Sequence, residues 1–249
     1  MSKLANKVAV ITGASKGIGA AIAKAYATEG ASVVVNYSSD KAGAERVVAD
    51  IVKGGGKAIA VQANVAVAAE VKQLFAAAKA AYNKLDILVN NAGVYKFEPL
   101  ETVTEEEFHR QFNTNVLGTI LATQEALQHF NGDGGSVINV GSVVSDNPLA
   151  NSVVYSATKG AVDTIAVALS KELGAKNVRV NTIAPGAVDT EGTQSVGIIG
   201  SDFEKQIVAS TPLGRIGLPD DIAKVAVFLG SSDAGWINGQ KVTVSGGQR

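Results

Sequence analysis

The chain has no cysteine among its 249 residues and only two histidines, His109 and His129. The absence of cysteine excludes disulfides, thiolate metal sites and cysteine nucleophiles. Two histidines are too few for a histidine-rich metal centre, so we expect no metal site. Neither histidine lies on the apolar stripe of its predicted helix, and we expect both side chains to be solvated.

The chain also has no excess of either charge, because its 22 Lys and Arg residues are balanced by 23 Asp and Glu residues, for a net charge of −1. Proteins that bind the nucleic-acid backbone carry a basic excess, so this balance argues against such a partner. No apolar run reaches the length of about 18 residues that spans a bilayer. The start, MSKLANKVAVITG, lacks the apolar core of a signal peptide. We expect a cytoplasmic protein with no membrane partner.

Two kinds of segment alternate along the whole chain. Short runs rich in Val and Ile predict seven strands, at Val8–Thr12, Ser32–Asn36, Lys57–Val61, Ile87–Asn90, Ser136–Val140, Val178–Ile183 and Lys241–Val244. The segments between them predict helices at Ile18–Glu29, Asp40–Val52, Ala66–Tyr82, Thr104–Phe130, Ser152–Leu173 and Asp220–Leu229. Alternating strands and helices predict an α/β fold, a doubly wound seven-stranded parallel sheet with helices on both faces. We expect a single domain over residues 1–249.

Several of the 27 glycines gather in the first turn. The strand Val8–Thr12 leads into the sequence GASKGIG, and a helix follows. Glycines allow a tight turn and let backbone N–H groups approach a pyrophosphate at a helix N-terminus. The spacing GxxxGxG also fits an ordinary tight turn, but its place at the start of an α/β chain favours dinucleotide binding. The residues expected to contact the cofactor here are Gly13, Ser15, Lys16, Gly17, Ile18 and Gly19.

The end of the second predicted strand indicates which dinucleotide fits. Sites for NAD usually place Asp or Glu there, about 20 residues after the glycine loop, to bind the ribose 2′-hydroxyl. This chain has Asn36, Tyr37 and Ser38 instead. A carboxylate would repel the 2′-phosphate of NADP, whereas Asn and Ser can donate hydrogen bonds to it. Lys16 adds a positive charge, unless it is simply a solvated loop lysine. We therefore expect NADP(H) to be favoured over NAD(H).

The helix predicted at Ser152–Leu173 carries two polar residues in line with its buried stripe. At 3.6 residues per turn the stripe consists of Tyr155, Lys159, Val162, Ala166, Leu169 and Leu173. A lysine in this position is costly unless it has partners, and the simpler alternative is a lysine that snorkels at the core margin. The functional interpretation is a phenol whose pKa an adjacent ammonium lowers from about 10 towards working pH, for acid–base catalysis.

Two more polar residues interrupt otherwise apolar positions. Asn115 lies on the apolar face of the helix predicted at Thr104–Phe130. It is either an amide bonded to a neighbouring loop or a functional group. Ser142 follows the predicted strand Ser136–Val140. Because ligands of open α/β sheets bind beyond the carboxyl ends of the strands, Ser142 should lie at the same edge as the glycine loop.

Together these motifs resemble the short-chain dehydrogenase/reductase family, in its short single-domain branch. The resemblance covers essentially the whole chain and rests on TGASKGIG (Thr12–Gly19), NNAG (Asn90–Gly93), Asn115, Ser142, YSATK (Tyr155–Lys159) and PGAVDT (Pro185–Thr190). It implies a Rossmann-like NAD(P)-dependent oxidoreductase. In that family's pattern Tyr155 is the general acid or base, Lys159 activates it and anchors the ribose, and Ser142 orients the substrate carbonyl. Asn115 would hold a proton-relay water, and Thr190 would bind the nicotinamide carboxamide.

The resemblance also implies the remaining cofactor contacts. They are Asn64, Val65, Asn91, Ala92, Gly93, Pro185, Gly186, Val188 and Thr190, together with Tyr155 and Lys159. Where the family often has Asp near the adenine, this chain has Asn64, which leaves adenine binding less polar. The stretches Gly217–Ala223 and Asp233–Gly239 look like those of ketoacyl reductases and fungal naphthol reductases, without fixing the substrate.

These features predict an NADPH-dependent reductase of a small-molecule ketone or 3-oxoacyl carbonyl, with Tyr155 as the proton donor. One alternative is an alcohol or sugar dehydrogenase, of the glucose type, that works in the oxidative direction. Another is a non-catalytic nucleotide-sensing protein, because a fold alone does not fix function. A sensor need not retain the complete set of Asn, Ser, Tyr and Lys, so the set favours an enzyme.

A second apolar face on the predicted helix Ser152–Leu173 predicts an oligomer. Ala157, Ala161, Ile165 and Ala168 form this face beside the core stripe. A helix that is apolar on most sides is buried on most sides. In a single domain the outer face must then meet another subunit, and the family resemblance points to a homotetramer.

The segment Gly186–Phe203 shows no clear helix or strand pattern. It contains four glycines and the apolar residues Val196, Ile198 and Ile199. Long loops in compact domains are usually functional. We expect a mobile lid that closes over the substrate, and the alternative is a loop packed permanently on a neighbouring subunit.

Overall fold

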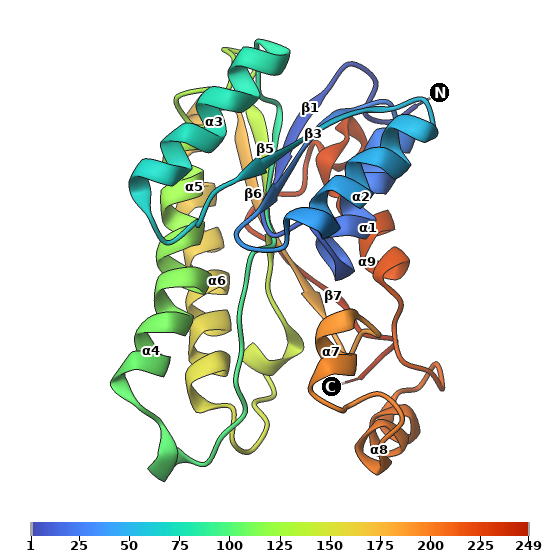
Figure 1. Cartoon of the computed structure of the whole chain (residues 1–249). Helices are drawn as coiled ribbons and strands as arrows, with labels where there is room; N and C mark the ends of the chain where they lie inside the picture. Colours follow the sequence, from blue (N-terminus) through green and yellow to red (C-terminus); the bar gives the residue numbers. More distant parts are fainter. Residues whose placement is uncertain (1, 249) are drawn as a thin grey trace.

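Seven parallel strands form one sheet in the order β3-β2-β1-β4-β5-β6-β7 (Figure 1). The computed structural model describes residues 2–248. The strands are β1 (Val8–Ile11), β2 (Ser32–Tyr37), β3 (Lys57–Gln62), β4 (Ile87–Asn90), β5 (Gly135–Val140), β6 (Val178–Pro185) and β7 (Lys241–Val244). Each strand lies where a run of Val and Ile predicted one, so the expected doubly wound parallel sheet is confirmed.

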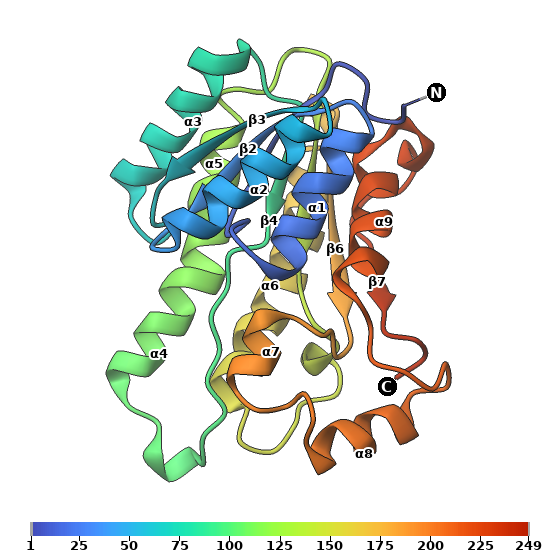
Figure 2. The same cartoon turned by 45° about the vertical axis from the view of Figure 1, so that its right-hand side comes forward.

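Helices cover both faces of this sheet (Figure 1). The long helices are α1 (Gly17–Thr28), α2 (Lys41–Lys53) and α9 (Pro219–Gly230) on one face, and α3 (Ala68–Tyr82), α5 (Gly118–Ala126) and α6 (Val153–Glu172) on the other. Three further helices, α4 (Glu105–Phe112), α7 (Glu191–Ser195) and α8 (Asp202–Ser210), lie beyond one end of the sheet in Figure 2. No helix within residues 2–248 has both the length and the apolar character that a bilayer crossing requires.

The central strands are largely apolar because both of their faces are covered. Successive side chains of a strand point to opposite faces. In β1, Ala9 and Ile11 belong to the core under α1, α2 and α9, whereas Val10 belongs to the core under α3, α5 and α6. All three side chains are fully buried. Continuous apolar runs are typical of such two-sided burial in parallel sheets.

The helix expected at Thr104–Phe130 is present without a gap from Glu105 to Ala126, but a π-helical turn interrupts its regular α geometry. α4 ends at Phe112, a π-helical turn spans Asn113–Leu117, and α5 ends at Ala126. The hydroxyl of Thr119 donates to the carbonyl oxygen of Asn115 at 2.8 Å, which satisfies a backbone acceptor in this turn. Single π turns often mark functional sites, and the apolar periodicity gave no sign of this one.

The segment Gly186–Phe203 was expected to have no regular secondary structure. The structure instead contains helices there. The segment contains α7, whose N-cap Thr190 accepts a hydrogen bond from the Thr193 N–H at 3.2 Å. It also leads into α8, which begins after the N-cap Ser201. Ser201 and Glu204 have the S-x-x-E spacing of a capping box, a signal that could have predicted α8.

One of the two histidines is not solvated. His109 is exposed, but the side chain of His129 is only 14% exposed. Its ring stacks on that of Phe75 from α3, with 5.8 Å between the centroids, and Nε2 lies 3.3 Å from Glu125. The prediction for His129 was wrong because α3 packs over this position from a distant part of the sequence.

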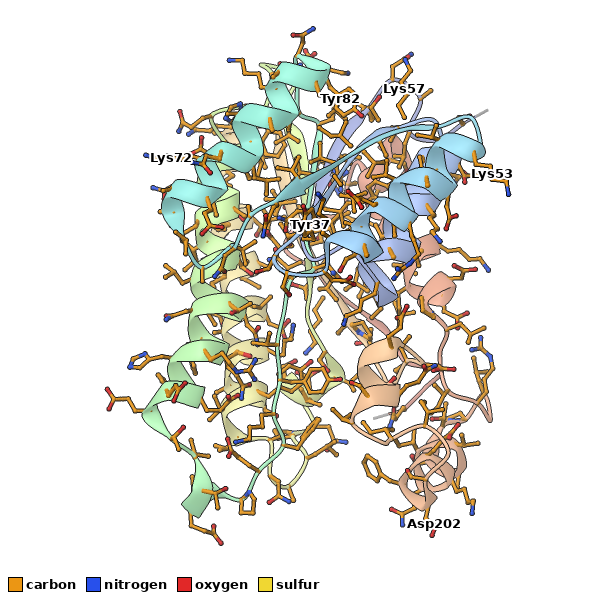
Figure 3. All side chains as sticks on the ribbon, in the orientation of Figure 1. Tyr37, Lys53, Lys57, Lys72, Tyr82 and Asp202 are labelled. Carbon is orange, nitrogen blue, oxygen red and sulfur yellow. The ribbon has the colours of Figure 1, made fainter. Side chains whose placement is uncertain are left out.

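The carboxyl ends of the strands meet at one edge of the sheet. In Figure 3, Lys57 marks the start of β3 and Tyr37 marks the end of β2. Because these two strands are parallel, the direction from Lys57 to Tyr37 is the direction in which both strands run. The order of the strands reverses between β1 and β4, the topological switch point. Open α/β sheets bind ligands in the crevice at this point.

Candidate active site

One cavity of about 880 Å³ extends along the carboxyl edge of the sheet. Its walls come from the segments that follow β1 to β6, so residues far apart in the chain share it. The predicted site residues that line it are Gly13, Ser15, Lys16, Gly17, Ile18, Asn36, Tyr37, Ser38, Asn64, Val65, Asn91, Ala92, Gly93, Ser142, Tyr155, Lys159, Pro185, Gly186, Val188 and Thr190.

Hydrogen bonds fasten the glycine loop to the loop after β4. The hydroxyl of Thr12 accepts hydrogen bonds from the backbone N–H groups of Asn91 and Ala92, both at 3.0 Å. Gly13 has a φ of 61°, and a Cβ there would lie 2.8 Å from the Cα of Ala92. Glycine is therefore required at this position. These contacts fix the shape of the cavity wall beside α1.

The start of α1 has the properties of an anion site. Its N-cap residue, Lys16, makes no capping hydrogen bond with its side chain. Free N–H groups and the helix dipole attract negative charge at such an end. The N–H of Gly17 donates to Glu191 Oε2 at 3.0 Å, from the first residue of α7. The acceptor here is a carboxylate, and a phosphate group fits the same chemistry.

Asn36 does not have the role expected of it. Its side chain is buried, and its amide is already fully engaged with the backbone. Oδ1 accepts from the N–H of Gly13 at 3.1 Å. Nδ2 donates to the carbonyl oxygens of Ala63 at 3.0 Å and of Val61 and Tyr37 at 3.3 Å. The expectation that Asn36 donates to a 2′-phosphate was therefore wrong; Asn36 joins the glycine loop to the end of β3.

Exposed residues near Asn36 remain free to contact a ligand. Lys16 and Ser38 line the cavity and are exposed to solvent. Asp40 also lines it and was missed by the sequence analysis. Its Oδ1 accepts from the N–H of Gly43 at 2.9 Å, as the N-cap of α2. Asp directly before an apolar periodic segment is typical of an N-cap, and that signal was present in the sequence.

Two predicted site residues lie behind the cavity lining instead of within it. A Cβ on Gly19 would lie 2.7 Å from the carbonyl oxygen of Gly13, so this glycine lets α1 approach the loop. The side chain of Asn115 bonds the N–H and carbonyl of Val94, both at 2.8 Å, and donates to Thr158 Oγ1 at 3.0 Å. The simpler alternative for Asn115, an amide bonded to a neighbouring loop, is the one that the structure has.

Tyr155 lies on α6 and lines the cavity together with Ser142 from the loop after β5. Burial raises the pKa of Tyr155 to about 12; the hydroxyl of Ser142 opposes this rise, and Tyr95 adds to it. The expectation of a phenol pKa lowered by Lys159 was therefore wrong. The ammonium of Lys159 lies over the face of the ring, 5.6 Å from its centroid, and burial dominates. Tyr155 is a neutral acid at pH 7.

Lys159 is a buried cation, 6% exposed. Its Nζ donates to the carbonyl oxygen of Val140 at 2.8 Å. Burial lowers the pKa of Lys159 to about 8, and the carboxylate of Asp163, one turn further along α6, opposes that change. This inward-pointing ammonium excludes the alternative of a lysine that snorkels to solvent.

The part of the cavity next to Tyr155 is apolar. The ring centroids of Tyr95 and Phe97 lie 5.6 Å and 6.1 Å from that of Tyr155. Further apolar side chains in the lining are Leu149, Ile198, Ile199, Phe203 and Ile207. The sequence analysis missed Tyr95 and Phe97, although two aromatic residues within four positions after the NNAG motif could have indicated them.

Comparison with known proteins gives close matches over the whole chain. A family model described as enoyl-(acyl carrier protein) reductase matches residues 13–249. An uncharacterized oxidoreductase of Methylorubrum extorquens is 57% identical over 249 residues, which is 100% of both chains. Elsinochrome reductase 1 of Elsinoe fawcettii is 40% identical over 255 residues, which cover 98% of this chain and 95% of the relative.

Solved structures agree with these relatives. A short chain dehydrogenase from Burkholderia cenocepacia in complex with NADP has a TM-score of 0.93 and 33% identity, over 99% of both chains. A short-chain dehydrogenase/reductase from Serratia marcescens has a TM-score of 0.93 and 35% identity, over 98% of both chains.

The contacts of Asn36 predict the effect of a change to aspartate. Asn36→Asp places a carboxylate oxygen against three backbone carbonyl oxygens. We expect a loss of about 2–3 kcal/mol of stability, or roughly 4–12 °C in melting temperature. Ser38→Asp is the matched control, because Ser38 is exposed, and it should melt like the wild type. Calorimetry measures both, and equal melting temperatures for the two variants would contradict this role.

Proposed function

Because the chain belongs to the short-chain dehydrogenase/reductase family of oxidoreductases, we propose that it reduces the carbonyl group of an uncharged, apolar ketone with NADPH. The observation that carries this proposal is Tyr155, a neutral phenol that shares the lining of an apolar cavity with Ser142. The phenol can donate a proton to a carbonyl oxygen, and the surrounding rings and aliphatic side chains suit an apolar substrate.

The residues of the cavity fit a nicotinamide dinucleotide. The start of α1, where Gly17 now donates to a carboxylate, would hold the pyrophosphate. Tyr155 and Lys159 would hold the ribose next to the nicotinamide, and Pro185, Gly186, Val188 and Thr190 would line the nicotinamide itself. When bound, the reduced nicotinamide supplies the hydride.

The chain's own groups supply the proton and the orientation. Ser142 and Tyr155 both direct hydrogen-bonding hydroxyls at a carbonyl oxygen, in the manner of an oxyanion site. The proton leaves the hydroxyl of Tyr155, and the charged ammonium of Lys159 stabilises the phenolate that remains. Because the pKa of Lys159 is about 8, we expect reductive turnover to fall as the pH rises through this value.

The charges around the cavity favour a ketone over a 3-oxoacyl thioester. Among the described residues, the only charged side chains in the lining are Lys16, Asp40 and Lys159. Basic residues next to the apolar lining are paired: Lys96 with Glu98, Lys205 with Asp202, and Arg215 with Asp221, at 2.7–2.8 Å. A thioester on a carrier or on coenzyme A brings phosphate groups. The three basic side chains that could bind these phosphates already have carboxylate partners in the described residues. One set of relatives is named hydroxynaphthalene reductase-like, which supports an aromatic ketone.

The alternative of a sugar or alcohol dehydrogenase fits less well. A sugar needs many hydrogen-bonding partners, whereas the lining beside Tyr155 is formed by aromatic and aliphatic side chains. Oxidation also needs Tyr155 as a base, and its pKa of about 12 makes the phenolate scarce at neutral pH.

A panel of substrates tests the reaction. Consumption of NADPH is measured with an uncharged aromatic ketone, a 3-oxoacyl thioester and a 2-enoyl thioester, and a sugar is tested with NADP. We expect the ketone to have the highest kcat/KM, by about tenfold or more. Tyr155→Phe should lower kcat by roughly 10²–10⁴-fold and leave NADPH binding nearly intact, because Lys159 still holds the ribose. Tyr82→Phe, at the remote end of α3, is the control. A Tyr155→Phe variant with near wild-type kcat would exclude the assignment.

We further propose that the enzyme prefers NADPH to NADH. Lys16 and Ser38 are exposed in the lining, and Asp40 is engaged at the N-terminus of α2. Lys16→Ala should raise KM for NADPH roughly tenfold to hundredfold with little change for NADH, because hydrogen bonds to charged groups contribute about 1.5–3 kcal/mol. Lys24→Ala removes a lysine of the same helix that pairs with Asp50, and serves as the control. Equal kcat/KM for both cofactors in the wild type would overturn the preference.

We propose that the segment 186–203 acts as a lid. It carries Glu191, which contacts Gly17, and Ile198 and Ile199, which line the cavity. Hydrogen exchange of this segment should slow when NADPH and a substrate analogue bind together, while that of α3 stays constant. Equal protection with and without ligands would favour a permanently packed loop.

We also propose a homotetramer. Ala157 and Ala168 on α6 are exposed, and Trp236, in the segment that precedes β7 in the chain, is 100% exposed. Two separate apolar faces are what a tetramer of two-fold symmetry needs. Light scattering should give four times the chain mass of 25.4 kDa, and half of that for Trp236→Glu or for Ala168→Glu. A wild-type mass of one chain would refute the proposal.

A further inference from the structure

A cluster of ionic side chains lies behind the catalytic residues, outside the cavity lining. The Nζ of Lys241, the first residue of β7, lies 2.8 Å from Asp163 Oδ2 and 2.7 Å from Asp146 Oδ2. It also donates to Ser145 Oγ at 2.5 Å. The side chains of Lys241 and Asp163 are only 20% and 19% exposed, so water screens this pair less than it screens a surface pair.

The partners of Lys241 belong to the two segments that carry the catalytic groups. Asp163 is on α6, two turns after Tyr155 and one turn after Lys159. Ser145 and Asp146 follow Ser142 in the loop after β5. The hydroxyl of Ser145 donates to the carbonyl oxygen of Ser142 at 2.8 Å. A continuous chain of contacts therefore runs from Lys241 through Ser145 to the backbone of Ser142.

We propose that Lys241 is a positioning residue, which holds the loop of Ser142 in place against the helix of Tyr155 and Lys159. The proposal rests on the proposed role of these three residues in proton transfer. Lys241 does not line the cavity and touches no reacting atom. It acts from the edge strand of the sheet, by tying one segment to the other through Asp163, Asp146 and Ser145.

Asp163 connects this cluster to the buried ammonium of Lys159. Its Oδ1 is buried and has no hydrogen-bond partner among the described residues, and a Cβ on Gly141, directly before Ser142, would lie 3.2 Å from it. The carboxylate thus lies between Lys241 and the catalytic loop. Its negative charge opposes the lowering of the pKa of Lys159 by burial.

Other ionisable groups lie close to these two side chains. The ring of Tyr155 lies under the ammonium of Lys159 and is itself in contact with Tyr95 from the loop after β4, while Asp163 and Asp146 both contact Lys241 on β7. A Cβ on Gly93 would lie 3.6 Å from Nζ of Lys159, and glycine brings no charge there. Asp163 is the group that favours the charged form of Lys159, and Lys241 holds Asp163 in place.

The first test compares Lys241→Met with Lys7→Met. Lys7 is a matched control, because it also flanks a strand and pairs with a carboxylate, Asp86, at 3.1 Å. In Lys241→Met we expect kcat to fall roughly tenfold to hundredfold, since small misplacements of catalytic groups have effects of this size. The Kd for NADPH should change less than about twofold. Lys241→Arg, which keeps the charge, should recover most of the rate, and Lys7→Met should match the wild type.

The second test uses the pH dependence of kcat. Asp163→Asn removes the negative charge nearest to Lys159 on α6, so the pKa of Lys159 should fall and the alkaline limb of the profile should move to lower pH. A merely structural role of Asp163 would lower activity without moving this limb. An unmoved limb would overturn the link from Asp163 to Lys159.

The third test does not depend on the reaction. Hydrogen exchange of the segment 141–146 should speed up in Lys241→Met and stay at the wild-type rate in Lys7→Met. Hydrogen exchange tests the positioning role even if the protein reduces no carbonyl compound. Such a lack of activity would refute the proposed function but not the positioning role. Two results for Lys241→Met would overturn the positioning role. One is unchanged hydrogen exchange in the segment 141–146, and the other is a loss of kcat that is fully explained by a smaller fraction of folded protein.

Discussion

The buried ammonium of Lys159 is the constraint around which the site is organised. A charge that is 6% exposed must have partners, because isolated burial of an ion costs far more than the net stability of a domain. Here the partners are the carbonyl of Val140, the face of the Tyr155 ring and the carboxylate of Asp163. These partners come from β5 and from α6. The position of one cation therefore constrains how α6 packs on the sheet.

The two ends of the cavity are built differently. At the α1 end, Thr12, Asn36 and Asn91 bond the backbones of neighbouring loops, so this wall is fixed before a cofactor binds. At the other end, α7 and α8 bring apolar side chains to the cavity and touch the fixed end through Glu191 and Gly17. If the cofactor binds at the rigid end, as proposed, a separately anchored opposite end would allow substrate preference to change without loss of cofactor binding.

Sequence patterns predicted most of the fold because local and global signals agree in it. The central strands are apolar on both faces, and the long helices have a regular periodicity, except where a π turn interrupts one of them. The errors came where a distant contact decided the outcome. The π turn at Asn113–Leu117 brings Asn115 to Val94 and Thr158, and α3 covers His129. α8 was missed although its capping signal, Ser201 with Glu204, was in the sequence.

By itself the sequence determined the order of strands and helices, the glycine loop and the placing of Tyr155 and Lys159 on one helix face. These follow from spacing, since residues four apart on a helix share a face. Only the tertiary structure decided what those groups are able to do. Burial holds Tyr155 as a neutral acid, three backbone carbonyls occupy the amide of Asn36, and Lys241 reaches Asp163 from the far end of the chain. Protonation states and hydrogen-bond partners depend on what surrounds a group in space, which spacing along the chain does not specify.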